Sequence, residues 1–228
     1  MTVTLVTGAN KGLGYETARQ LIEQGHSLYL GARNAERGEA AARALDGQFV
    51  QLDVTDDSSV GTALDVIAER EGRLDVLVNN AGISAVGDVT GPIALGVFDT
   101  NVIGIVRVTQ AALPFLEQSE NPVVVNVSSA LGSFWAVTNP ERRQFHFPSI
   151  VYGSSKAAVS MLTVQYAKSF PGIKFNAVEP GFTATELTPF SGAGQPVEKG
   201  AEAIVRMATI GRDGPTGTFQ EGEGELAW

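Results

Sequence analysis

Residues 7–14 read TGANKGLG and directly follow the first apolar run of the chain, Val3 to Val6. The pattern predicts a buried strand, a glycine-rich turn and then a helix over 14–24. Such a turn presents backbone N–H groups and the positive end of a helix dipole, which together favour a pyrophosphate. The glycine spacing differs from the common G-x-G-x-x-G dinucleotide fingerprint. On its own it indicates either a phosphate site or an ordinary tight turn.

Further along the chain, apolar strand-like runs alternate with helix-like segments. The predicted strands cover 26–33, 48–54, 74–82, 122–129, 173–181 and 216–219, and the predicted helices cover 34–45, 58–71, 95–116, 150–169 and 197–208. Asn34 is suited to cap the first of these helices, and Asp56 or Asp57 to open the second. Most strands are apolar on both faces, which indicates a parallel sheet covered on both sides. We therefore expect an α/β fold, a Rossmann-type doubly wound parallel sheet of about seven strands in a single domain over 1–228.

Composition narrows the classes of function. The 228 residues carry a formal net charge of −9, which argues against a nucleic-acid partner because phosphates need a basic surface. The chain has no cysteine, which excludes disulfides and thiolate metal sites, and we predict no metal. The first residues lack a signal-peptide pattern, and the apolar stretch 93–116 is interrupted by Asp99, Asn101 and Arg107. We expect a cytoplasmic protein without a membrane span.

The end of the second predicted strand bears on the choice of cofactor. NAD sites usually place an acidic residue there for the ribose 2′-hydroxyl, but residues 31–34 read GARN and the first carboxylate is Glu36. Arg33, Arg37 and Lys11 could instead converge on a 2′-phosphate, each charge-assisted contact contributing roughly 1.5–3 kcal/mol. The alternative is that they are ordinary solvated charges. On so acidic a chain we favour the phosphate and predict NADP(H) as the cofactor.

A second set of polar residues lies at the carboxyl edge of the predicted sheet, where ligands bind in such folds. Tyr152 and Lys156 are spaced i, i+4 and share one face of a predicted helix. Two serines at 128–129 end the fifth strand, NNAG at 79–82 ends the fourth, and Asn101 lies in the helix that follows. Strand alternation points the two serine hydroxyls to opposite sides, so only one of them can serve the site.

At this order and spacing the motifs resemble those of the short-chain dehydrogenase/reductase family over nearly the whole chain. The matching motifs are TGANKGLG at 7–14, NNAG at 79–82, Asn101, Ser129, Y-x-x-x-K at 152–156 and P-G-x-x-x-T at 180–185. The lysine and arginines of the cofactor region look most like the carbonyl-reductase-type, NADPH-dependent members. The resemblance implies a catalytic tetrad of Asn101, Ser129, Tyr152 and Lys156. It also implies cofactor contacts from Gly8, Asn10, Lys11, Gly12, Leu13, Gly14, Arg33, Arg37, Asp53, Val54, Asn80, Ala81, Gly82, Tyr152, Lys156, Pro180, Gly181, Thr183 and Thr185.

The resemblance further implies hydride transfer from nicotinamide C4 to a carbonyl carbon. Tyr152 would donate the proton to the oxygen, and the Lys156 ammonium would lower the tyrosine pKa from about 10 toward working pH. Ser129 would hydrogen-bond the carbonyl oxygen, Lys156 would also hold the nicotinamide ribose, and Asn101 would position a water. Asp53 would accept the adenine amino group or, as an equally simple role, cap the following helix.

Three segments would wall the substrate pocket: the stretch after the serine, the stretch before the tyrosine, and the loop 182–196, which we predict to be a mobile substrate loop. They offer Leu131, Phe134, Trp135, Phe145, Phe147, Phe182, Leu187 and Phe190. Such a pocket suits a small hydrophobic ketone or aldehyde. Two alternatives stay open. One is a β-ketoacyl thioester reductase, with Arg142, Arg143 and Lys199 meeting a carrier protein; the other is a sensor that binds NADP(H) without turnover.

The stretch between the serine and the tyrosine is longer than in the compact members that the sequence resembles. Asn139 and Pro140 are suited to cap and begin a short helix there. If that helix packs back, Phe145 and Phe147 would cover the substrate pocket, and His146 would contact substrate or lie on the surface. Whether this stretch covers the helix face used for dimerisation in relatives stays open, and so does the choice between monomer and homodimer.

Overall fold

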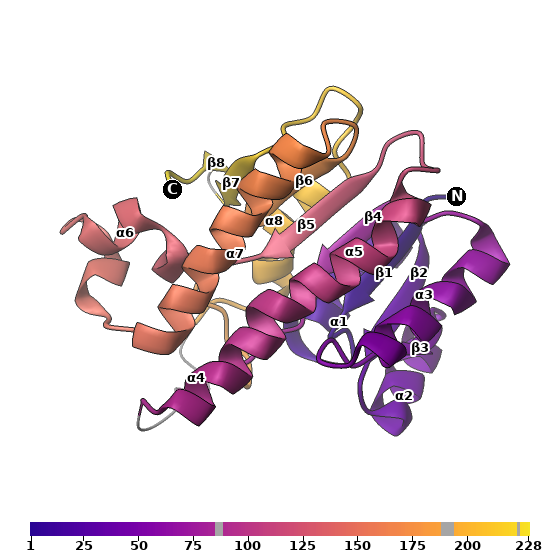
Figure 1. Ribbon diagram of the computed structural model, residues 1–228, viewed down its shortest axis with the longest axis horizontal. Helices are drawn as coiled ribbons and strands as arrows, with labels where there is room; N and C mark the ends of the chain where they lie inside the picture. Colours follow the sequence, from indigo (N-terminus) through magenta and orange to yellow (C-terminus); the bar gives the residue numbers. More distant parts are fainter. Residues whose placement is uncertain (85–88, 188–193, 223) are drawn as a thin grey trace.

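A mostly parallel sheet forms the centre of the protein in a computed structural model, which describes residues 1–84, 89–187, 194–222 and 224–228 (Figure 1). Within these residues the sheet has eight strands in the order β3-β2-β1-β4-β5-β6-β7-β8. Their bounds are β1 Val3–Thr7, β2 Ser27–Ala32, β3 Gln48–Gln51, β4 Val76–Asn79, β5 Val123–Val127, β6 Lys174–Val178, β7 Thr218–Glu221 and β8 Gly224–Glu225. Neighbouring strands are parallel except β7 and β8, and the strand order reverses between β1 and β4. This is the predicted doubly wound topology.

Helices cover both faces of the sheet, and strand alternation decides which side chains meet them. Leu5 and Val124 belong to the core cluster that includes α3, α5 and α7, whereas their neighbours Val6 and Val125 belong to the cluster with α1, α2 and α8. The helix bounds are α1 Gly12–Glu23, α2 Ala35–Leu45, α3 Asp57–Glu71, α4 Gly91–Phe98, α5 Gly104–Leu116, α6 Phe134–Thr138, α7 Ile150–Ser169 and α8 Val197–Ala208.

Local capping signals place several helix ends as predicted. Asn34 accepts a hydrogen bond from the Arg37 main-chain nitrogen at 2.8 Å, and Asp56 accepts from the first turn of α3. The predicted helix 95–116 differs in two respects. It begins earlier, at α4 after the Thr90 N-cap, and a π-helical turn, Asp99–Ile103, separates α4 from α5. The two-residue antiparallel β8 was not predicted.

The prediction of a helix beginning at Pro140 is wrong. The short helix there is α6, which lies before Asn139 and is capped by Ser133, whose Oγ accepts from Ala136 N at 3.0 Å. The Asn139 side chain instead accepts from Glu141 N in a turn, and a 3₁₀ turn follows over Arg143–His146. The Ser133 hydroxyl also donates to Ala227 O at 2.7 Å, which ties the start of α6 to the C-terminal segment.

The continuous helical segment Gly91–Leu116 has the length and apolar composition that a membrane-crossing helix needs. Core helices pass the same test. In this fold Val108 and Ala112 are buried in the core beside the sheet, and Arg107 pairs with Asp99 at 2.8 Å. Packing on the sheet therefore buries part of the apolar surface of this helical segment.

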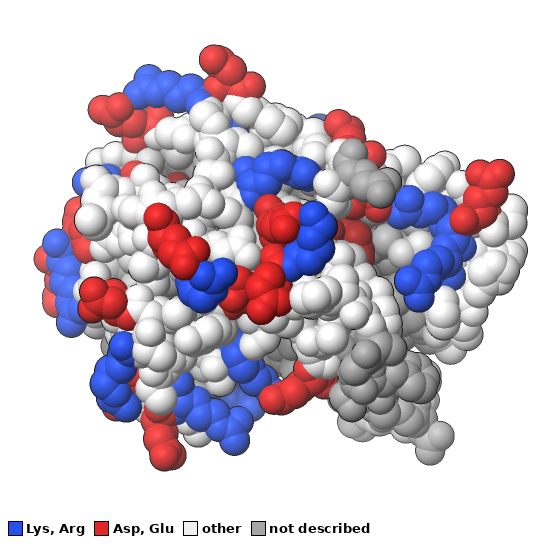
Figure 2. Space-filling model, turned by 180° about the vertical axis from the view of Figure 1, so that it is seen from behind, with Lys and Arg blue, Asp and Glu red and all other residues white. Residues whose placement is uncertain are grey.

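Charged side chains of both signs are interspersed on the face of the molecule shown in Figure 2. Among the described residues visible there, Lys and Arg do not form a continuous basic surface. This distribution is consistent with the net charge of −9. Any anionic ligand must therefore be met by a local group of cations.

Candidate active site

The candidate site is built where β5 and β6 end and α7 begins. Tyr152 lies in the first turn of α7, whose N-cap Ser149 accepts from Gly153 N at 3.2 Å. Gly132, in the 3₁₀ turn after β5, packs directly on this helix: a Cβ there would lie 2.4 Å from the main-chain carbonyl carbon of Lys156. This close approach needs glycine, and it brings Ser129 up to the tyrosine.

Lys156 lies one turn after the tyrosine and is only 4% exposed. Its Nζ donates to Val127 O at 2.7 Å and lies 5.6 Å from the centre of the Tyr152 ring. Burial, which disfavours the ammonium, lowers the lysine pKa to about 8, although the Glu179 carboxylate acts in the opposite direction. A buried cation thus lies beside the tyrosine.

Of the two adjacent serines, Ser129 is the one next to the tyrosine. Ser128 is buried, and its hydroxyl donates to Lys156 O at 3.2 Å. The hydroxyls of Ser129 and Tyr152 are hydrogen-bonded to each other. The structure therefore brings Ser129, Tyr152 and Lys156 together.

The pKa of Tyr152 is raised, whereas the sequence predicts that Lys156 lowers it. Burial of the phenol is the main cause and the negative charge of Glu179 the second, while the hydrogen bond with Ser129 acts in the opposite direction. The expectation failed because it considered the lysine alone and neither the burial nor the neighbouring carboxylate. Tyr152 therefore keeps its proton at neutral pH.

Glu179 is the site residue that sequence reasoning missed. It directly follows β6, is 8% exposed, and its Oε2 accepts from Ala130 N. Its carboxylate is also hydrogen-bonded to the Ser129 hydroxyl and to Gly181 N. The signal in the sequence was a single carboxylate at the end of an apolar strand, immediately before Pro180.

Asn101 is completely buried in the π-helical turn. Its side-chain amide accepts from Ile83 N at 2.8 Å and donates to Ile83 O at 2.9 Å and to Ser155 Oγ at 3.1 Å. These partners occupy the amide, so a water at this position would have to be held by the main-chain carbonyl. Asn101 thus ties the loop after β4 to α7 beside the candidate site.

The glycine turn and the segment after β4 form one unit. Thr7 Oγ1 accepts from the main-chain nitrogens of Asn80 and Ala81 at 3.0 Å, and Asn80 Nδ2 donates to Thr7 O at 2.9 Å. Gly8 has a φ of 65°, and a Cβ on Gly14 would lie 2.5 Å from Gly8 O. Asn10, Gly12 and Leu13 lie on the same turn and Gly82 on the linked segment. The result is a main-chain cradle at the N-terminus of α1, in which Gly8, Gly12 and Gly14 carry no side chain.

The three cations predicted to bind the 2′-phosphate are only partly brought together. Lys11 stands at the N-cap of α1 and its Nζ forms an ion pair with Glu186. The pKa of Glu186 is lowered by Lys11 and, to a smaller extent, by Arg37, so these three charges are neighbours. Arg33 is exposed just after β2, and among the described residues neither arginine forms an ion pair. Glu186 thus stands among the cations predicted to bind the 2′-phosphate.

Asp53 does not cap α3, because Asp56 does. The Asp53 carboxylate accepts from Thr55 N at 3.0 Å and from Thr55 Oγ1 at 2.7 Å, in a turn after β3. Val54 is buried, and its carbonyl oxygen accepts from Arg107. The capping role considered for Asp53 is therefore wrong, and its contact with adenine stays a prediction.

The segment after β6 runs over the glycine turn. Gln195 Nε2 donates to Pro180 O at 2.6 Å, and Thr183 pairs with Gln195 in a parallel bridge. Gly181 has a φ of 78°, which turns the chain toward the cradle, and a Cβ on Gly12 would lie 3.7 Å from Thr185 Cγ2. The predicted mobile loop 182–196 and its Phe190 fall partly outside the described residues, which omit 188–193.

A cavity of about 430 Å³ lies between α7 and the stretch that precedes it. Its lining includes Phe145 and Phe147 with Gly153 and Ala157 of α7, and also Leu131 and Phe134, but none of the four predicted catalytic residues. The two phenylalanines therefore line a groove on another side of α7. His146 packs edge-on against Phe145 at 5.1 Å and is exposed, which agrees with a surface role.

The same stretch approaches the segment after β6 and the C-terminal segment through its arginines. The Arg143 guanidinium lies 5.6 Å from the centre of the Phe182 ring, while Arg142 pairs with Glu221 at 2.7 Å. Trp135, another predicted pocket residue, lies under Arg142 at 5.3 Å. The Phe182 ring therefore lies beside the Arg143 guanidinium.

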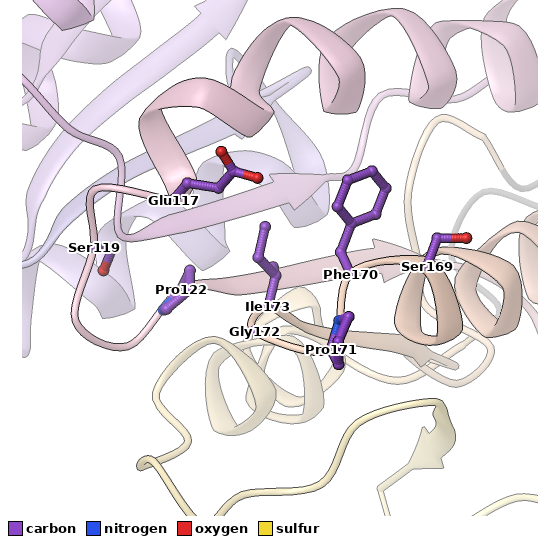
Figure 3. Close-up of a pocket in the computed structure, with 8 residues that line it drawn as sticks. All are labelled: Glu117, Ser119, Pro122, Ser169, Phe170, Pro171, Gly172 and Ile173. Atoms are coloured by element: carbon purple, nitrogen blue, oxygen red, sulfur yellow. The ribbon is translucent and has the colours of Figure 1, made fainter.

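A further hollow of about 350 Å³ lies at the opposite edge of the sheet, where β5 and β6 begin (Figure 3). It is lined by Glu117, Ser119, Pro122, Ser169, Phe170, Pro171, Gly172 and Ile173. The lining holds one carboxylate and no cation, and it lies away from the glycine cradle. It offers nothing that would bind an anionic dinucleotide.

Comparison with known proteins gives the family. A model of the short chain dehydrogenase family matches residues 2–195, and the chain belongs to this family. The (−)-isopiperitenone reductase of Mentha piperita is 33% identical, with 94% of each chain covered, and the (+)-neomenthol dehydrogenase of Capsicum annuum is 30% identical, again with 94% of each covered. A solved structure of NADPH-bound carbonyl reductase from chicken fatty liver superposes with a TM-score of 0.86 at 26% identity, covering 100% of both chains.

The site and the comparisons together define a class of protein. A family of oxidoreductases, a doubly wound sheet and a Ser–Tyr–Lys cluster at its carboxyl edge indicate an enzyme that acts on alcohol or carbonyl groups. The alignment with the Capsicum annuum enzyme spans 295 positions, more than the 228 residues of this chain. That relative therefore carries insertions that this chain lacks.

Proposed function

We propose that this protein uses NADPH to reduce the carbonyl group of a small hydrophobic ketone or aldehyde to an alcohol. One observation carries the proposal: the Tyr152 hydroxyl is hydrogen-bonded to Ser129 and lies beside the buried Lys156 ammonium. This arrangement supplies a proton donor and a hydrogen-bond donor for a single developing oxyanion. The raised pKa of Tyr152 keeps that proton donor in its acid form.

The chain's own residues fit a nicotinamide dinucleotide phosphate. Gly8, Gly12 and Gly14 carry no side chain at the start of α1, and an added Cβ at Gly14 would lie 2.5 Å from Gly8 O, so the tight turn needs glycine there. Lys11 and Arg37 lie close enough to Glu186 to lower its pKa, so the same two cations can meet a 2′-phosphate. The structural relative from chicken is NADPH-bound, which supports the same choice.

Bound NADPH would supply a hydride to the carbonyl carbon, and the protein residues would deal with the oxygen. Tyr152 would transfer its phenolic proton to that oxygen. Ser129 would donate a hydrogen bond as negative charge develops. Lys156 would hold the ribose hydroxyls and stabilise the tyrosinate that forms when Tyr152 gives up its proton. Asn101 would hold the adjoining loop with its side chain and a water with its main-chain carbonyl.

The substrate class is proposed from the pocket residues and from relatives. Phe182 and Leu187 are 41% and 40% exposed on the loop after β6, so apolar surface is available beside the site. The named relatives act on neomenthol and isopiperitenone, which are small cyclic compounds with few polar groups. A hydrophobic cyclic ketone is therefore the first substrate to test.

The two other candidate functions receive less support. A carrier protein would need several free cations near the site, but Arg142 pairs with Glu221 at 2.7 Å and Lys199 with Glu202 at 2.5 Å, and of the three cations considered this leaves Arg143, which lies over the Phe182 ring. A sensor that only binds NADP(H) would not need the contact between Tyr152 and Ser129. We therefore propose a reductase, in a single domain, with 182–196 as its substrate loop.

A screen of NADPH consumption tests the proposal. Monocyclic ketones, diketones, quinones, aldehydes and acetoacetyl thioesters would be offered to the purified protein with NADPH and, separately, with NADH. We expect turnover of ketones or aldehydes with NADPH in preference to NADH. Preferred turnover of the thioesters would replace the substrate class, and tight NADPH binding without turnover of any compound would favour the sensor.

A further inference from the structure

Glu179 is a buried carboxylate that the proposed chemistry does not use. It is 8% exposed, and among the described residues it forms no ion pair with a lysine or arginine. Main-chain N–H groups of Ala130 and Gly181 donate to it, and so does the hydroxyl of Ser129. A charge held in this way is costly to bury, so its position against the catalytic serine needs a reason.

The reason lies in the number of protons on Ser129. A serine hydroxyl has one proton to donate, and three acceptors compete for it: the Glu179 carboxylate, the Tyr152 oxygen and the proposed substrate carbonyl. The serine oxygen also accepts from Leu131 N at 3.3 Å, which fixes its position. An ionised Glu179 can only accept, so it holds the serine proton. A protonated Glu179 can donate to the serine oxygen and leave the serine proton free.

We propose that Glu179 is a positioning residue whose protonated form releases the Ser129 hydroxyl to donate to the substrate carbonyl oxygen, and whose ionised form withholds it. This inference rests on the carbonyl reduction proposed above. Glu179 acts through Ser129 and does not itself touch the reacting atoms. Carbonyl reduction should therefore slow as Glu179 loses its proton.

The groups around Glu179 set the pH at which this happens. Burial raises its pKa above the ordinary 4.5, and Glu221 of β7 acts in the same direction, whereas the hydrogen bonds from Ala130, Gly181 and Ser129 lower it. From α7, the Lys156 ammonium favours the ionised carboxylate. An ionised Glu179 also raises the pKa of Tyr152, which weakens the proton donor. Both effects slow reduction as pH rises through the glutamate pKa.

Glu179→Gln tests the inference. Glutamine keeps the shape and an acceptor oxygen, while its amide nitrogen only donates and never ionises. Between the pKa of Glu179 and about 8, where Lys156 titrates, kcat of the wild-type protein should fall roughly 10-fold per pH unit, whereas in Glu179→Gln it should stay level over that interval. Glu16→Gln is the matched control, because Glu16 is also buried, at 5% exposed, but pairs with Arg19 on α1. It should keep the wild-type profile, and a wild-type profile in Glu179→Gln would overturn the proposal.

A second measurement does not depend on turnover. Carboxyl ¹³C NMR of glutamate-labelled protein should show a resonance that is absent from Glu179→Gln and titrates above 4.5. Ser129→Ala should raise the pKa of that resonance further, because it removes a hydrogen bond to the ionised form. An unchanged pKa in Ser129→Ala would overturn the link between the two residues, whatever the substrate. If Ser129→Ala shifts the pKa as expected but the protein reduces no carbonyl compound, the proposed function is wrong, and so is the role of Glu179 toward the substrate.

Discussion

Lys156 and Glu179 are two groups of opposite charge that the fold buries in one site, at 4% and 8% exposed. Burial acts on them in opposite directions in pKa, lowering that of the lysine and raising that of the glutamate, since it favours the neutral form of each. Each charge keeps a hydrogen bond to the main chain: Lys156 donates to Val127 O, and Glu179 accepts from Ala130 N. The chemistry of the site therefore depends on the fraction of Lys156 and of Glu179 that is ionised.

The stability of the protein should depend on Lys156 in a defined pH range. Its pKa is about 8 in the folded protein against 10.5 ordinarily, so between these values the unfolded chain binds more protons. The contribution of Lys156 to stability is full above 10.5 and is lost as pH falls toward 8. The difference, 10.5 − 8 = 2.5, corresponds to about 3 kcal/mol. Urea unfolding at pH values across this range should show a rise in the wild type that Lys156→Met lacks, and equal pH slopes would show that the lysine ionises normally.

Cofactor choice should depend on Arg33 and be opposed by Glu186. Arg33→Ala should weaken NADPH binding by about 10- to 150-fold and leave NADH binding unchanged, because one charge-assisted contact with the 2′-phosphate is lost. Glu186→Gln should strengthen NADPH binding by no more than about 5-fold, since an exposed ion pair contributes at most about 1 kcal/mol. Titration of each variant with both cofactors measures the difference. Equal losses for NADH and NADPH in Arg33→Ala would show that the arginine does not bind the phosphate.

Between elements, the decisive contact is that of the 3₁₀ turn after β5 with α7. The turn reaches the helix because Gly132 has no side chain, and this contact places Ser129 beside Tyr152. α7 itself begins and ends at the predicted residues, 150–169, because Ser149 caps it and its sequence contains no interior proline. The position of the site along α7 is thus set by local sequence, and its closure by one glycine.

Gly132→Ala should therefore damage both stability and turnover. The added Cβ would lie 2.4 Å from the main chain of Lys156, which cannot move without shifting α7. We expect a loss of roughly 1–3 kcal/mol in the free energy of unfolding and a lower kcat. Gly61→Ala in α3 is the control, because nothing lies within 4 Å of its added Cβ and helix propensity favours alanine by up to about 1 kcal/mol. Equal stability of the two variants would mean that the turn and the helix are not in close contact.

For the whole molecule, the sequence predicts the features that repeat or act locally. Apolar runs and capping residues are sufficient to predict the doubly wound sheet, and motif order is sufficient to predict which residues gather at its carboxyl edge. What it did not predict depends on pairing across the fold. β8 consists of two residues held by β7, Lys11 meets a carboxylate far along the chain in Glu186, and Glu179 gains its importance only when β6 is placed next to Ser129. The pKa of Tyr152 was mispredicted for the same reason.

We propose above that the folded protein reduces a carbonyl group with Tyr152 as the proton donor. Tyr152→Phe keeps the aromatic ring and removes only the hydroxyl, so it separates catalysis from binding. The most direct measurement compares kcat on the best ketone and Kd for NADPH in the wild type and in this variant. We expect kcat to fall about 10²- to 10⁴-fold while the Kd for NADPH stays unchanged. Near-normal turnover in Tyr152→Phe would contradict the proposal.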